Sequence, residues 1–295
     1  MIRALAKNVL MSLLRILPWR AQDVVLYAAK LRRFPRISKP MYLNDHVMRR
    51  KWTECHANPI YAMLADKVLV RDYVKDAIGS GYLLPLIHVT EDPRELASWL
   101  LGRTSVVVKP NHGAGMVRVV NSPLSESETS SLSETAAKWL SKDFSNVARE
   151  AHYARIPRKI IVEQRIGNGN APPDDFKLHV FRGGEFAAFV LQIVEERSER
   201  GLTRTFYDNQ FEVPTSGARI LSEDEARLCK TALDLSYRLL GDMHYARVDW
   251  YIDNGYLWFG EITLTPAAGL GTGYASLDLV MGEYWNMAQL ESSEK

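Results

Sequence analysis

Cysteine is scarce in this chain of 295 residues: only Cys55 and Cys229 occur, too few for a disulfide framework and without the spacing of a zinc site. No run of about 18 to 20 apolar residues is present, so no membrane-spanning helix is predicted. The first apolar run is interrupted by Arg15 and followed by no clear cleavage site, so no signal peptide is predicted either. These absences favour a reducing compartment, and we expect a cytoplasmic protein.

Several familiar functional motifs are also missing. The chain contains no G-x-x-x-x-G-K-[ST] phosphate loop, no G-x-G-x-x-G dinucleotide fingerprint and no Asp-x-Asp sugar-nucleotide signature. Zinc-finger spacing and aromatic RNA-binding motifs are absent, which argues against a nucleic-acid-binding protein. No Ser-His-Asp or Cys-His nucleophile is evident. The hydrophobic fraction of 46 % and the charged fraction of 24 % are typical of a globular protein with one large domain or two modest ones.

Charge is unevenly distributed along the chain, although the net value is only +2. Residues 1–51 hold 12 Lys and Arg against 2 Asp and Glu, a net of +10, and the remainder holds 25 against 33, a net of −8. A basic block beside an acidic body indicates an anionic partner. A membrane surface or an anionic polymer fits this pattern better than a nucleic acid does.

Residues 1–17 have the pattern of an amphipathic helix that ends at Pro18. Its apolar stripe comprises Ile2, Leu5, Val9, Leu13 and Ile16. Such a helix can lie in a membrane interface, and it can equally pack its stripe on the domain; the sequence leaves both readings open. Peripheral contact with the inner face of a membrane through residues 1–51 is therefore one expectation.

Hydrophobic periodicity predicts a mixture of helices and strands further along the chain. Helices are expected through most of residues 20–60, with breaks near Pro35 and Pro40, and then at 62–78, 92–101, from 125 to about 139 and from 222 to about 239. Strands are expected at 83–89, 105–110, 117–120, 160–164, 174–181, 185–194, 247–252 and 256–263. Residues 195–219 are expected to form a polar loop.

A loop of small residues, Asn111-His112-Gly113-Ala114-Gly115, separates the strands predicted at 105–110 and 117–120. The backbone N–H groups of such a loop can fold over phosphate groups. Lys109, at the end of the first strand, can then reach phosphate oxygens. The alternative is a surface hairpin whose lysine is solvated, and this is the more common outcome for the pattern taken alone.

The last hairpin carries one acidic residue on each strand, Asp249 and Glu261, on either side of Asp253-Asn254-Gly255. A carboxylate is costly to bury unless something pairs with it, and two that converge can hold Mg²⁺. A two-residue turn would put the acids on opposite faces, whereas a three-residue loop with a left-handed Gly255 makes them diagonal neighbours on one face. The metal interpretation therefore predicts the three-residue loop; the alternative is a surface hairpin with two solvated acids.

An ordered set of segments runs from about residue 40 to about residue 285, and no single motif in the set is specific. The segments are Asp66-Lys67, Arg71-Asp72-Tyr73-Val74, Val108 to Gly115, Val162-Glu163, Asp175-Phe176-Lys177, Arg204 to Asp208, Arg247-Val248-Asp249, Phe259 to Thr263 and Pro266. In this order they resemble the TupA-like ATP-grasp family, which is named for teichuronopeptide biosynthesis.

The resemblance implies an α+β protein with the ATP-grasp fold, in which two α+β subdomains clamp ATP between them. It implies an ATP-grasp domain at 105–290, divided into an N-subdomain at about 105–165 and a C-subdomain at about 166–290. Residues 61–104 would form a reduced pre-ATP-grasp region. Residues 1–60 would form a helical, basic N-terminal extension, most of which lies outside the resemblance.

The resemblance also implies a nucleotide site. Lys109 would contact nucleotide phosphate, and Lys67 looks like a second lysine of the same site. The loop His112-Gly113-Ala114-Gly115 would close over the phosphates. Glu163 and Gln164 would lie in the hinge strand whose backbone meets adenine.

The remaining positions resemble the reacting part of the family's site. Asp175-x-Lys177 resembles the pair placed near the γ-phosphate and the acyl group. Asp249 and Glu261 match the two metal carboxylates. Thr263 stands where many ATP-grasp enzymes have an asparagine ligand, and its hydroxyl is a weaker oxygen ligand for a second Mg²⁺. An arginine would neutralise the transferring oxygens, with Arg247 as first choice because it shares the strand face of Asp249, and Arg197 or Arg204 as alternatives.

These roles imply an ATP- and Mg²⁺-dependent, ADP-forming ligase that joins a carboxylate to an amine through an acyl phosphate. The expected acceptor is a uronic acid or another carboxylate of a cell-surface polysaccharide or its precursor, and the expected donor is an amino acid or amine. The alternatives are a kinase acting on a sugar or small molecule, a polysaccharide-biosynthesis glycosyltransferase, and a nucleotide-binding protein without catalysis.

Overall fold

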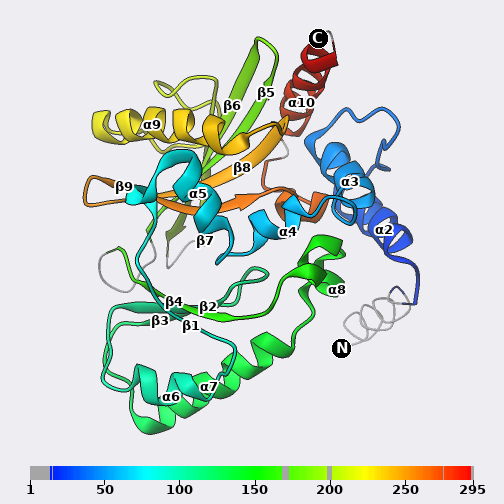
Figure 1. Ribbon diagram of the computed structural model, residues 1–295. Coiled ribbons are helices and arrows are strands. Elements are labelled where there is room, and N and C mark those ends of the chain that lie inside the picture. Colours follow the sequence, from blue (N-terminus) through cyan, green and yellow to red (C-terminus); the bar gives the residue numbers. More distant parts are fainter. Residues whose placement is uncertain (1–13, 15, 168–172, 198–200, 275, 294–295) are drawn as a thin grey trace.

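The computed structural model describes residues 14, 16–167, 173–197, 201–274 and 276–293. These residues form two lobes, each built on an antiparallel sheet with helices on its outer side (Figure 1). The two sheets face each other across the middle of the molecule. Separate antiparallel sheets with helices on one face make the α+β class that the sequence predicted.

The smaller sheet has four strands: β1 (Leu86–Thr90), β2 (Val106–Pro110), β3 (Arg118–Val120) and β4 (Ile160–Gln164). Their spatial order is β1-β4-β2-β3. α6 (Glu95–Leu100) and α7 (Glu126–Ser141) cover the face that is lower in Figure 1. Because side chains alternate along a strand, Val162 packs into this helical layer while Glu163 turns to the opposite face.

The larger sheet has five strands: β5 (Asp175–Gly183), β6 (Phe186–Arg197), β7 (Gly201–Asp208), β8 (Tyr245–Asp253) and β9 (Tyr256–Thr263). Their spatial order is β7-β6-β5-β8-β9. α9 (Glu223–Leu240) and α5 (Val70–Ile78) cover one face, where Leu178 and Val248 meet the buried stripe of α9. The opposite face of β5, β8 and β9 is left for polar side chains.

The expectation of a polar loop at 195–219 is wrong for residues 195–197, which belong to β6, and for residues 201–208, which form β7. This strand pairs with β6 along its whole length, from Gly201 opposite Arg197 to Asp208 opposite Val190. An edge strand needs partners along only one side, so it tolerates the polar residues that made this stretch look like a loop. Within it, Tyr207 is fully buried in the core.

The other helices and turns are short, apart from the last helix. They are α2 (Trp19–Leu31), α3 (Leu43–Thr53), α4 (Ile60–Ala65), α8 (Phe144–Ala148), α10 (Asp278–Ser293) and the 3-10 turns η1 (Ser80–Tyr82), η2 (Ala151–Arg155) and η3 (Pro266–Gly269). α2 ends before the predicted break at Pro35, and α3 begins after the predicted break at Pro40. The helix predicted at 1–17 lies outside the described residues, which include only residues 14, 16 and 17 of that segment.

α4 and α5 replace the single helix predicted at 62–78. They separate at Asp66, whose Oδ1 accepts the N–H of Val68 at 2.8 Å and the side-chain amide of Asn111 at 2.9 Å. A side-chain acceptor of this kind competes with propagation of the helix. The backbone N–H of Lys67 then donates to the carbonyl oxygen of Asn111 at 3.0 Å. The break thus places Lys67 beside the loop that follows β2.

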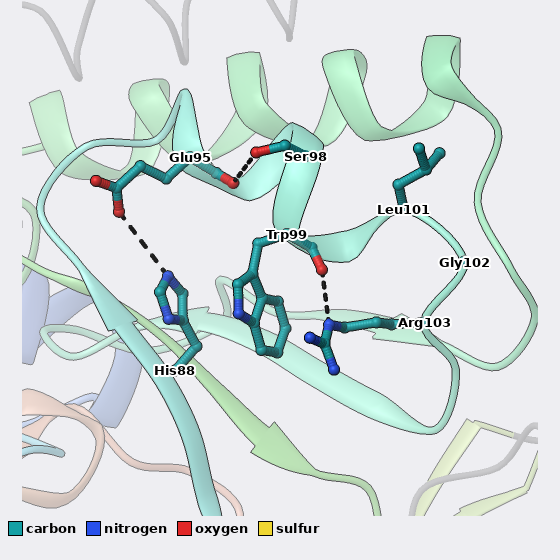
Figure 2. Close-up of a pocket in the computed structure, with 7 residues that line it drawn as sticks. All are labelled: His88, Glu95, Ser98, Trp99, Leu101, Gly102 and Arg103. Carbon is teal, nitrogen blue, oxygen red and sulfur yellow. Dashed lines mark hydrogen bonds and ion pairs between the residues drawn. The ribbon is translucent and has the colours of Figure 1, made fainter.

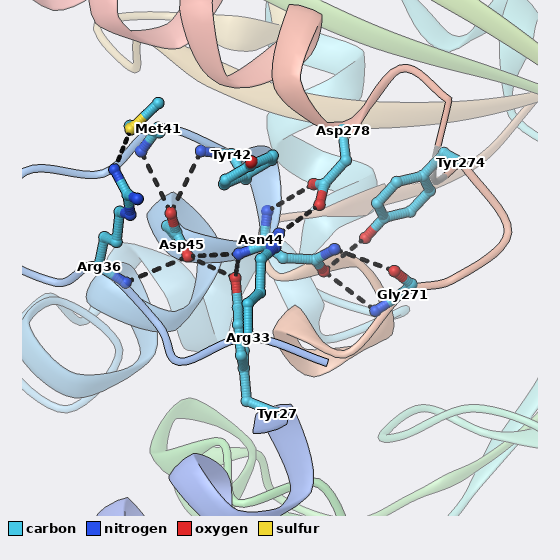
Figure 3. A network of polar contacts seen from close by, with 10 residues as sticks. All are labelled: Tyr27, Arg33, Arg36, Met41, Tyr42, Asn44, Asp45, Gly271, Tyr274 and Asp278. Atoms are coloured by element: carbon cyan, nitrogen blue, oxygen red, sulfur yellow. Dashed lines mark hydrogen bonds and ion pairs between the residues drawn. The ribbon is translucent and has the colours of Figure 1, made fainter. Parts of the chain in front are cut away.

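A buried polar network fixes the loop between α2 and α3 and ties it to α10 (Figure 3). Arg33 lies 3.0 Å from Asp45 and 2.6 Å from Asp278, and the N–H of Asn44 donates to Asp278 at 3.0 Å. The carboxylate of Asp45 also accepts the backbone N–H groups of Arg36, Met41 and Tyr42. The loop is therefore held in one conformation from its inner side.

Asp23 in α2 joins the two lobes. Its buried carboxylate accepts hydrogen bonds from Lys51 Nζ at 2.9 Å, Trp52 Nε1 at 3.0 Å and Arg149 Nε at 2.6 Å. Arg149 follows α8, between the smaller sheet's helix α7 and its strand β4. The neighbouring Glu150 is buried as well, and burial, partly offset by Lys51, raises its pKa to about 7.

Glu150 makes stability depend on pH. Because its pKa rises from 4.5 to about 7 on folding, the folded protein binds more protons than the unfolded chain across this window. Stability therefore falls as pH rises through the window and is flat above it. We expect the free energy of unfolding to drop by up to about 3 kcal/mol more in the wild type than in Glu150→Gln. Urea denaturation across this pH range measures the free energy of unfolding. The same dependence on pH in the wild type and in Glu150→Gln would contradict the role given to Glu150.

β1 and α6 lie within residues 61–104, and they belong to the smaller lobe together with residues that follow position 105. α3, in the N-terminal extension, packs against α10 and η3 of the larger lobe. The division into separate domains stays a prediction. No helix in the described part of the chain is long and apolar enough to cross a membrane.

Candidate active site between the two sheets

The turn between β8 and β9 contains two residues. Asn254 and Gly255 both have positive φ, 50° and 77°, and Asp253 pairs directly with Tyr256. The predicted three-residue loop is therefore wrong. A two-residue turn with both φ values positive matches the twist of the flanking strands, and Asn-Gly is a preferred sequence for it.

A β-bulge at Gly260 nevertheless brings both acids to one face. Trp250 pairs with Phe259 and Asp249 pairs with Glu261, so Gly260 is the extra residue in the ladder. The extra residue reverses the alternation of side chains beyond it. A Cβ at Gly260 would lie 2.9 Å from the carbonyl oxygen of Asp249, which favours glycine there. The predicted shared face is confirmed, but the acids are direct rather than diagonal neighbours.

Three charged side chains form a row across β5, β8 and β9: Lys177 lies opposite Asp249, and Asp249 lies opposite Glu261. Lys177 Nζ is 2.7 Å from Asp249 Oδ2 and 3.1 Å from Asp175 Oδ2. Burial raises the pKa of Asp175, although Lys177 opposes that rise. The lysine is thus held between two carboxylates.

Arg247 lies opposite Thr263, one pair further along the same face. Its Nε and Nη2 donate to the two oxygens of Asp249 at 2.6 and 2.8 Å. Nη2 also lies 3.2 Å from Glu261 Oε1 and 2.9 Å from Thr263 Oγ1. The hydroxyl of Thr263 in turn donates to Glu261 Oε1 at 2.9 Å. Thr263 therefore helps to orient the Glu261 carboxylate.

The two opposed acids are both ionised. Burial alone would raise the pKa of Asp249, but Arg247 and Lys177 outweigh it and hold that pKa below its ordinary value. Burial also opposes ionisation of Glu261, and the positive charges of Lys67, Arg247 and Lys177 lower its pKa in spite of this and of the neighbouring Asp249. Both carboxylates can therefore serve as metal ligands or as partners of cations near neutral pH.

Lys109, at the end of β2, meets a carboxylate from the neighbouring strand. Its Nζ lies 2.5 Å from Glu163 Oε2, and Arg71 Nη1 lies 3.4 Å from the other oxygen of Glu163. Arg71 also donates to the carbonyl oxygen of Leu84 at 2.5 Å. Arg71 is a contact that the predicted set of site residues omitted, although the sequence resemblance included it.

Lys67 connects the glycine loop with the row of acids. Its Nζ donates to the carbonyl oxygen of Gly113 at 2.8 Å and lies 3.8 Å from Glu261 Oε2. Burial lowers the pKa of Lys67, and Glu261 counteracts that effect. Gly113 has a φ of 79°, and a Cβ there would lie 2.5 Å from the ring of Phe144. The loop can take this path only with glycine at that position.

A cavity of about 530 Å³ lies between the two sheets and brings most of the predicted site residues together. The predicted residues that line it are Lys67, Lys109, Gly113, Ala114, Gly115, Glu163, Gln164, Asp175, Lys177, Asp249 and Glu261. Side chains that the sequence reasoning did not select also line it: Leu84, Val107, Met116, Ile166 and Tyr251. Strand alternation could have found Tyr251, because it lies two residues after Asp249 on one strand.

Among the described side chains, four predicted residues do not line the cavity: Arg247 and Thr263, which contact Glu261, and His112 and Arg204. His112 is 1 % exposed, its Nε2 lies 3.3 Å from the carbonyl oxygen of Lys142, and burial lowers its pKa. Arg204 is exposed on β7. Its side chain lies against Gly273, where an added Cβ would be 2.9 Å from Arg204 Nε. Arg197 ends β6, and its side chain is outside the described part of the structure. Of the three candidate arginines, only Arg247 contacts the row of acids in the described residues.

The turn after β9 is braced by α3. Ala267 and Ala268 have φ values of 50° and 53°, a left-handed conformation that costs about 1 to 3 kcal/mol for each residue that is not glycine. Arg50 Nη1 donates to the carbonyl oxygen of Leu264 at 3.0 Å, and Lys51 Nζ donates to that of Ala268 at 3.1 Å. These bonds hold a strained turn directly after the strand that carries Glu261.

A divalent ion would have to be held by few protein ligands. The described residues contain no group of three His, Cys, Asp or Glu side chains that could hold a metal ion. Mg²⁺ often takes one or two carboxylates and completes its shell with water and substrate phosphates. Asp249 and Glu261 fit this pattern because they are ionised and adjacent. The side chain of Glu261 is 36 % exposed and that of Asp249 only 3 %, so Glu261 is the more accessible ligand.

A model of the family described as TupA-like ATPgrasp matches residues 46–286. The chain belongs to the TupA-like ATP-grasp family. The resemblance read from the sequence is thereby confirmed, and the ATP-grasp fold with it. The match begins within α3 and ends within α10, so α2 and the loop after it lie outside. No curated protein matches the chain.

Solved structures of ligases are similar to this chain at low sequence identity. A D-alanine–D-alanine ligase from Helicobacter pylori has 16 % identity and a TM-score of 0.47, covering 77 % of this chain and 61 % of that one. A D-alanine–D-alanine ligase from Bacillus anthracis complexed with ATP has 16 % and 0.45, covering 79 % and 67 %. An L-amino acid ligase from Bacillus licheniformis has 16 % and 0.46, covering 85 % and 63 %. This chain thus spans about three fifths of the first ligase's length.

Lys109 gives a direct test of the cavity as an ATP site. We expect Lys109→Met to weaken ATP binding by about 10- to 100-fold, because a charged hydrogen bond to phosphate is worth about 1.5 to 3 kcal/mol. Lys138→Met is the matched control, since Lys138 is exposed on α7 outside the cavity. Isothermal titration calorimetry with ATP measures both variants. Equal affinities for the two would remove Lys109 from the nucleotide site.

Proposed function

We propose that the protein is an ATP- and Mg²⁺-dependent ligase that joins a carboxylate to an amine and releases ADP and phosphate. The observation that supports this best is the arrangement of charges around the cavity. Lys109 and Lys67 line one side of it, Lys177 lines the other beside the ionised Asp249 and Glu261, and Arg247 contacts both of these carboxylates. Catalysis of phosphoryl transfer consists mostly of positioning and charge stabilisation, which is what such a site supplies.

The proposed reaction has two steps. An oxygen of the substrate carboxylate attacks the γ-phosphorus of ATP, the bond to the bridging oxygen breaks, and ADP leaves. The acyl phosphate then has phosphate as a leaving group in place of oxide. The amine nitrogen attacks the acyl carbon, phosphate leaves, and the nitrogen loses a proton. Lys177 and Arg247, both held on Asp249, would neutralise the charge on the transferring oxygens.

The residues around the cavity divide into parts with different proposed roles. Lys109 and the loop Gly113-Ala114-Gly115 would hold the phosphates of ATP. Glu163 and Gln164 would lie beside adenine, where the apolar wall of the cavity suits a flat ring. Asp175 would keep Lys177 in place through the ion pair at 3.1 Å.

Asp249 and Glu261 would hold Mg²⁺. The hydroxyl of Thr263 is already engaged with Arg247 and Glu261, so we assign it to orientation of the Glu261 carboxylate rather than to the metal. When bound, the ion neutralises phosphate charge and polarises a phosphoryl oxygen.

The proposed acceptor is a uronic acid or another carboxylate of a cell-surface polysaccharide or its precursor, and the proposed donor is an amino acid or amine. Family membership supports this choice, since the family is named for teichuronopeptide biosynthesis. The basic block at residues 1–51 also suits an enzyme that meets polyanionic or membrane-bound intermediates. We propose that the enzyme acts in the cytoplasm, at the inner face of the membrane.

Product analysis separates this proposal from its rivals. The purified protein is incubated with ATP, Mg²⁺ and a panel of uronates and amines, and the products are identified by mass spectrometry. A ligase yields an amide, ADP and free phosphate. A sugar kinase would leave phosphate on the product. A glycosyltransferase would transfer a sugar and would release no ADP from ATP. Absence of ADP with every uronate and amine would count heavily against the ligase.

Two arginines on the same sheet give a matched pair of variants. We expect Arg247→Gln to lower kcat by about 100-fold or more, because one preorganised donor to a transition-state charge is worth roughly 3 kcal/mol. Arg204→Gln should leave kcat nearly unchanged, since Arg204 is exposed and, among the described contacts, reaches neither Asp249 nor Glu261, whereas Arg247 reaches both. Steady-state ADP release measures both, with thermal unfolding as a check on folding. Equal losses in the two variants would refute the role given to Arg247.

A further inference from the structure

The stretch between Asp23 and Asp45 contains no acidic residue and five basic ones. The five are Lys30, Arg32, Arg33, Arg36 and Lys39. Only Arg33 turns inward, to its ion pairs with Asp45 and Asp278. The other four are exposed, and none of them forms an ion pair with another described residue. Their positive charge is therefore uncompensated at this edge of the molecule.

Large apolar side chains are exposed beside these charges. Phe34, between Arg32 and Arg36, is 72 % exposed, and Met41 is 38 % exposed. Ile16, Leu17 and Val25 add further exposed apolar surface at and before α2. α2 and the loop that follows it lie at the outer edge of the molecule, on the side away from the β8–β9 hairpin (Figure 1). Water is a poor environment for this much apolar surface.

The loop that carries Phe34 is rigid on its inner side. Asp45 accepts the backbone N–H groups of Arg36 and Met41, both at 3.2 Å. Figure 3 places these two side chains at one side of the network, opposite Asp278 and Tyr274. Because the network already fixes the backbone, a partner that binds here has little conformational entropy to overcome.

We propose that Lys30, Arg32, Arg36 and Lys39, with Phe34 inserted among the headgroups, form a binding surface for an anionic lipid bilayer. Basic residues next to an anionic membrane each strengthen binding about fivefold. An aromatic ring at the centre of such a patch gains by entering the interface. An acidic polysaccharide would account for the charges but not for the exposed Phe34, so the lipid surface is favoured.

This surface is distinct from the nucleotide cavity and lies outside residues 46–286, where the family match runs. One hollow outside the cavity is lined by His88, Glu95, Trp99 and Arg103, among other residues (Figure 2). There both faces of Trp99 are already covered. The His88 ring stacks on it with 4.8 Å between ring centroids, and Arg103 Cζ lies 4.0 Å from the Trp99 ring centroid. That hollow offers no free aromatic face, whereas Phe34 does.

Co-sedimentation of the full chain with vesicles tests the proposal. The vesicles are equimolar phosphatidylcholine and phosphatidylglycerol, compared with phosphatidylcholine alone. We expect the variant Arg32→Glu, Arg36→Glu, Lys39→Glu to lose about 100-fold or more of its partition coefficient. Phe34→Ser should lose about 10-fold. The matched control, Lys138→Glu, Lys142→Glu, Lys230→Glu, makes the same change in net charge at exposed sites elsewhere and should change binding about twofold.

Three results would overturn the proposal. One is wild-type protein that does not bind the phosphatidylglycerol vesicles. Another is equal binding by the loop variant and the control variant. The third is binding to soluble polygalacturonate but not to vesicles, which would assign the surface to an acidic polymer. Circular dichroism and unchanged ATP affinity establish that each variant is folded. The assay needs no turnover, so its failure leaves the proposed ligase reaction intact and removes only the proposed action at the membrane. Failure of the ligase reaction leaves the lipid-binding surface intact.

Discussion

Two carboxylates that face each other directly on adjacent strands repel, and much of the structure serves to offset that repulsion. Arg247 comes from the strand of Asp249 itself, and Lys177 from the neighbouring strand β5. Lys67 reaches Glu261 from outside the sheet, which requires the break between α4 and α5. The cations that stabilise these acids in the free protein are also those that a polyphosphate would need. In the proposed ligase, binding of nucleotide would exchange the partners of cations that are already in place.

The smaller sheet also pairs carboxylates with cations, but here a single carboxylate serves more than one cation. There one carboxylate, Glu163, holds two cations, Lys109 and Arg71. Both walls of the cavity thus keep their positive groups on fixed carboxylates, which prevents the long side chains from folding back into solvent. The two lobes are in turn joined at Asp23, so the N-terminal helices are structurally part of the cavity's frame although they do not line it.

The sequence was a good guide wherever the signal was local. β4 begins and ends where the apolar run predicted, and α7 and α9 begin directly after Ser125 and Ser222, where helices were expected to start. It failed where the decision depended on distant contacts. The turn before β9 was assigned one residue too many, because nothing local shows that Gly260 must approach the carbonyl oxygen of Asp249. Strand alternation did favour Arg247 over Arg204, but only the order of the strands shows that Arg204 lies on the edge strand β7, away from the acids.

The bulge at Gly260 divides the β8–β9 hairpin into two mechanically independent parts. Strand register at the acids is set by a contact inside the sheet and not by the turn. The conformation of the hairpin tip therefore does not determine how Asp249 and Glu261 pair. Asn254 and Gly255 are exposed, and Tyr256 beside them is 67 % exposed. The tip is accordingly a permissive position, where insertions can accumulate during divergence, or an epitope can be grafted, without displacing Asp249 from Glu261.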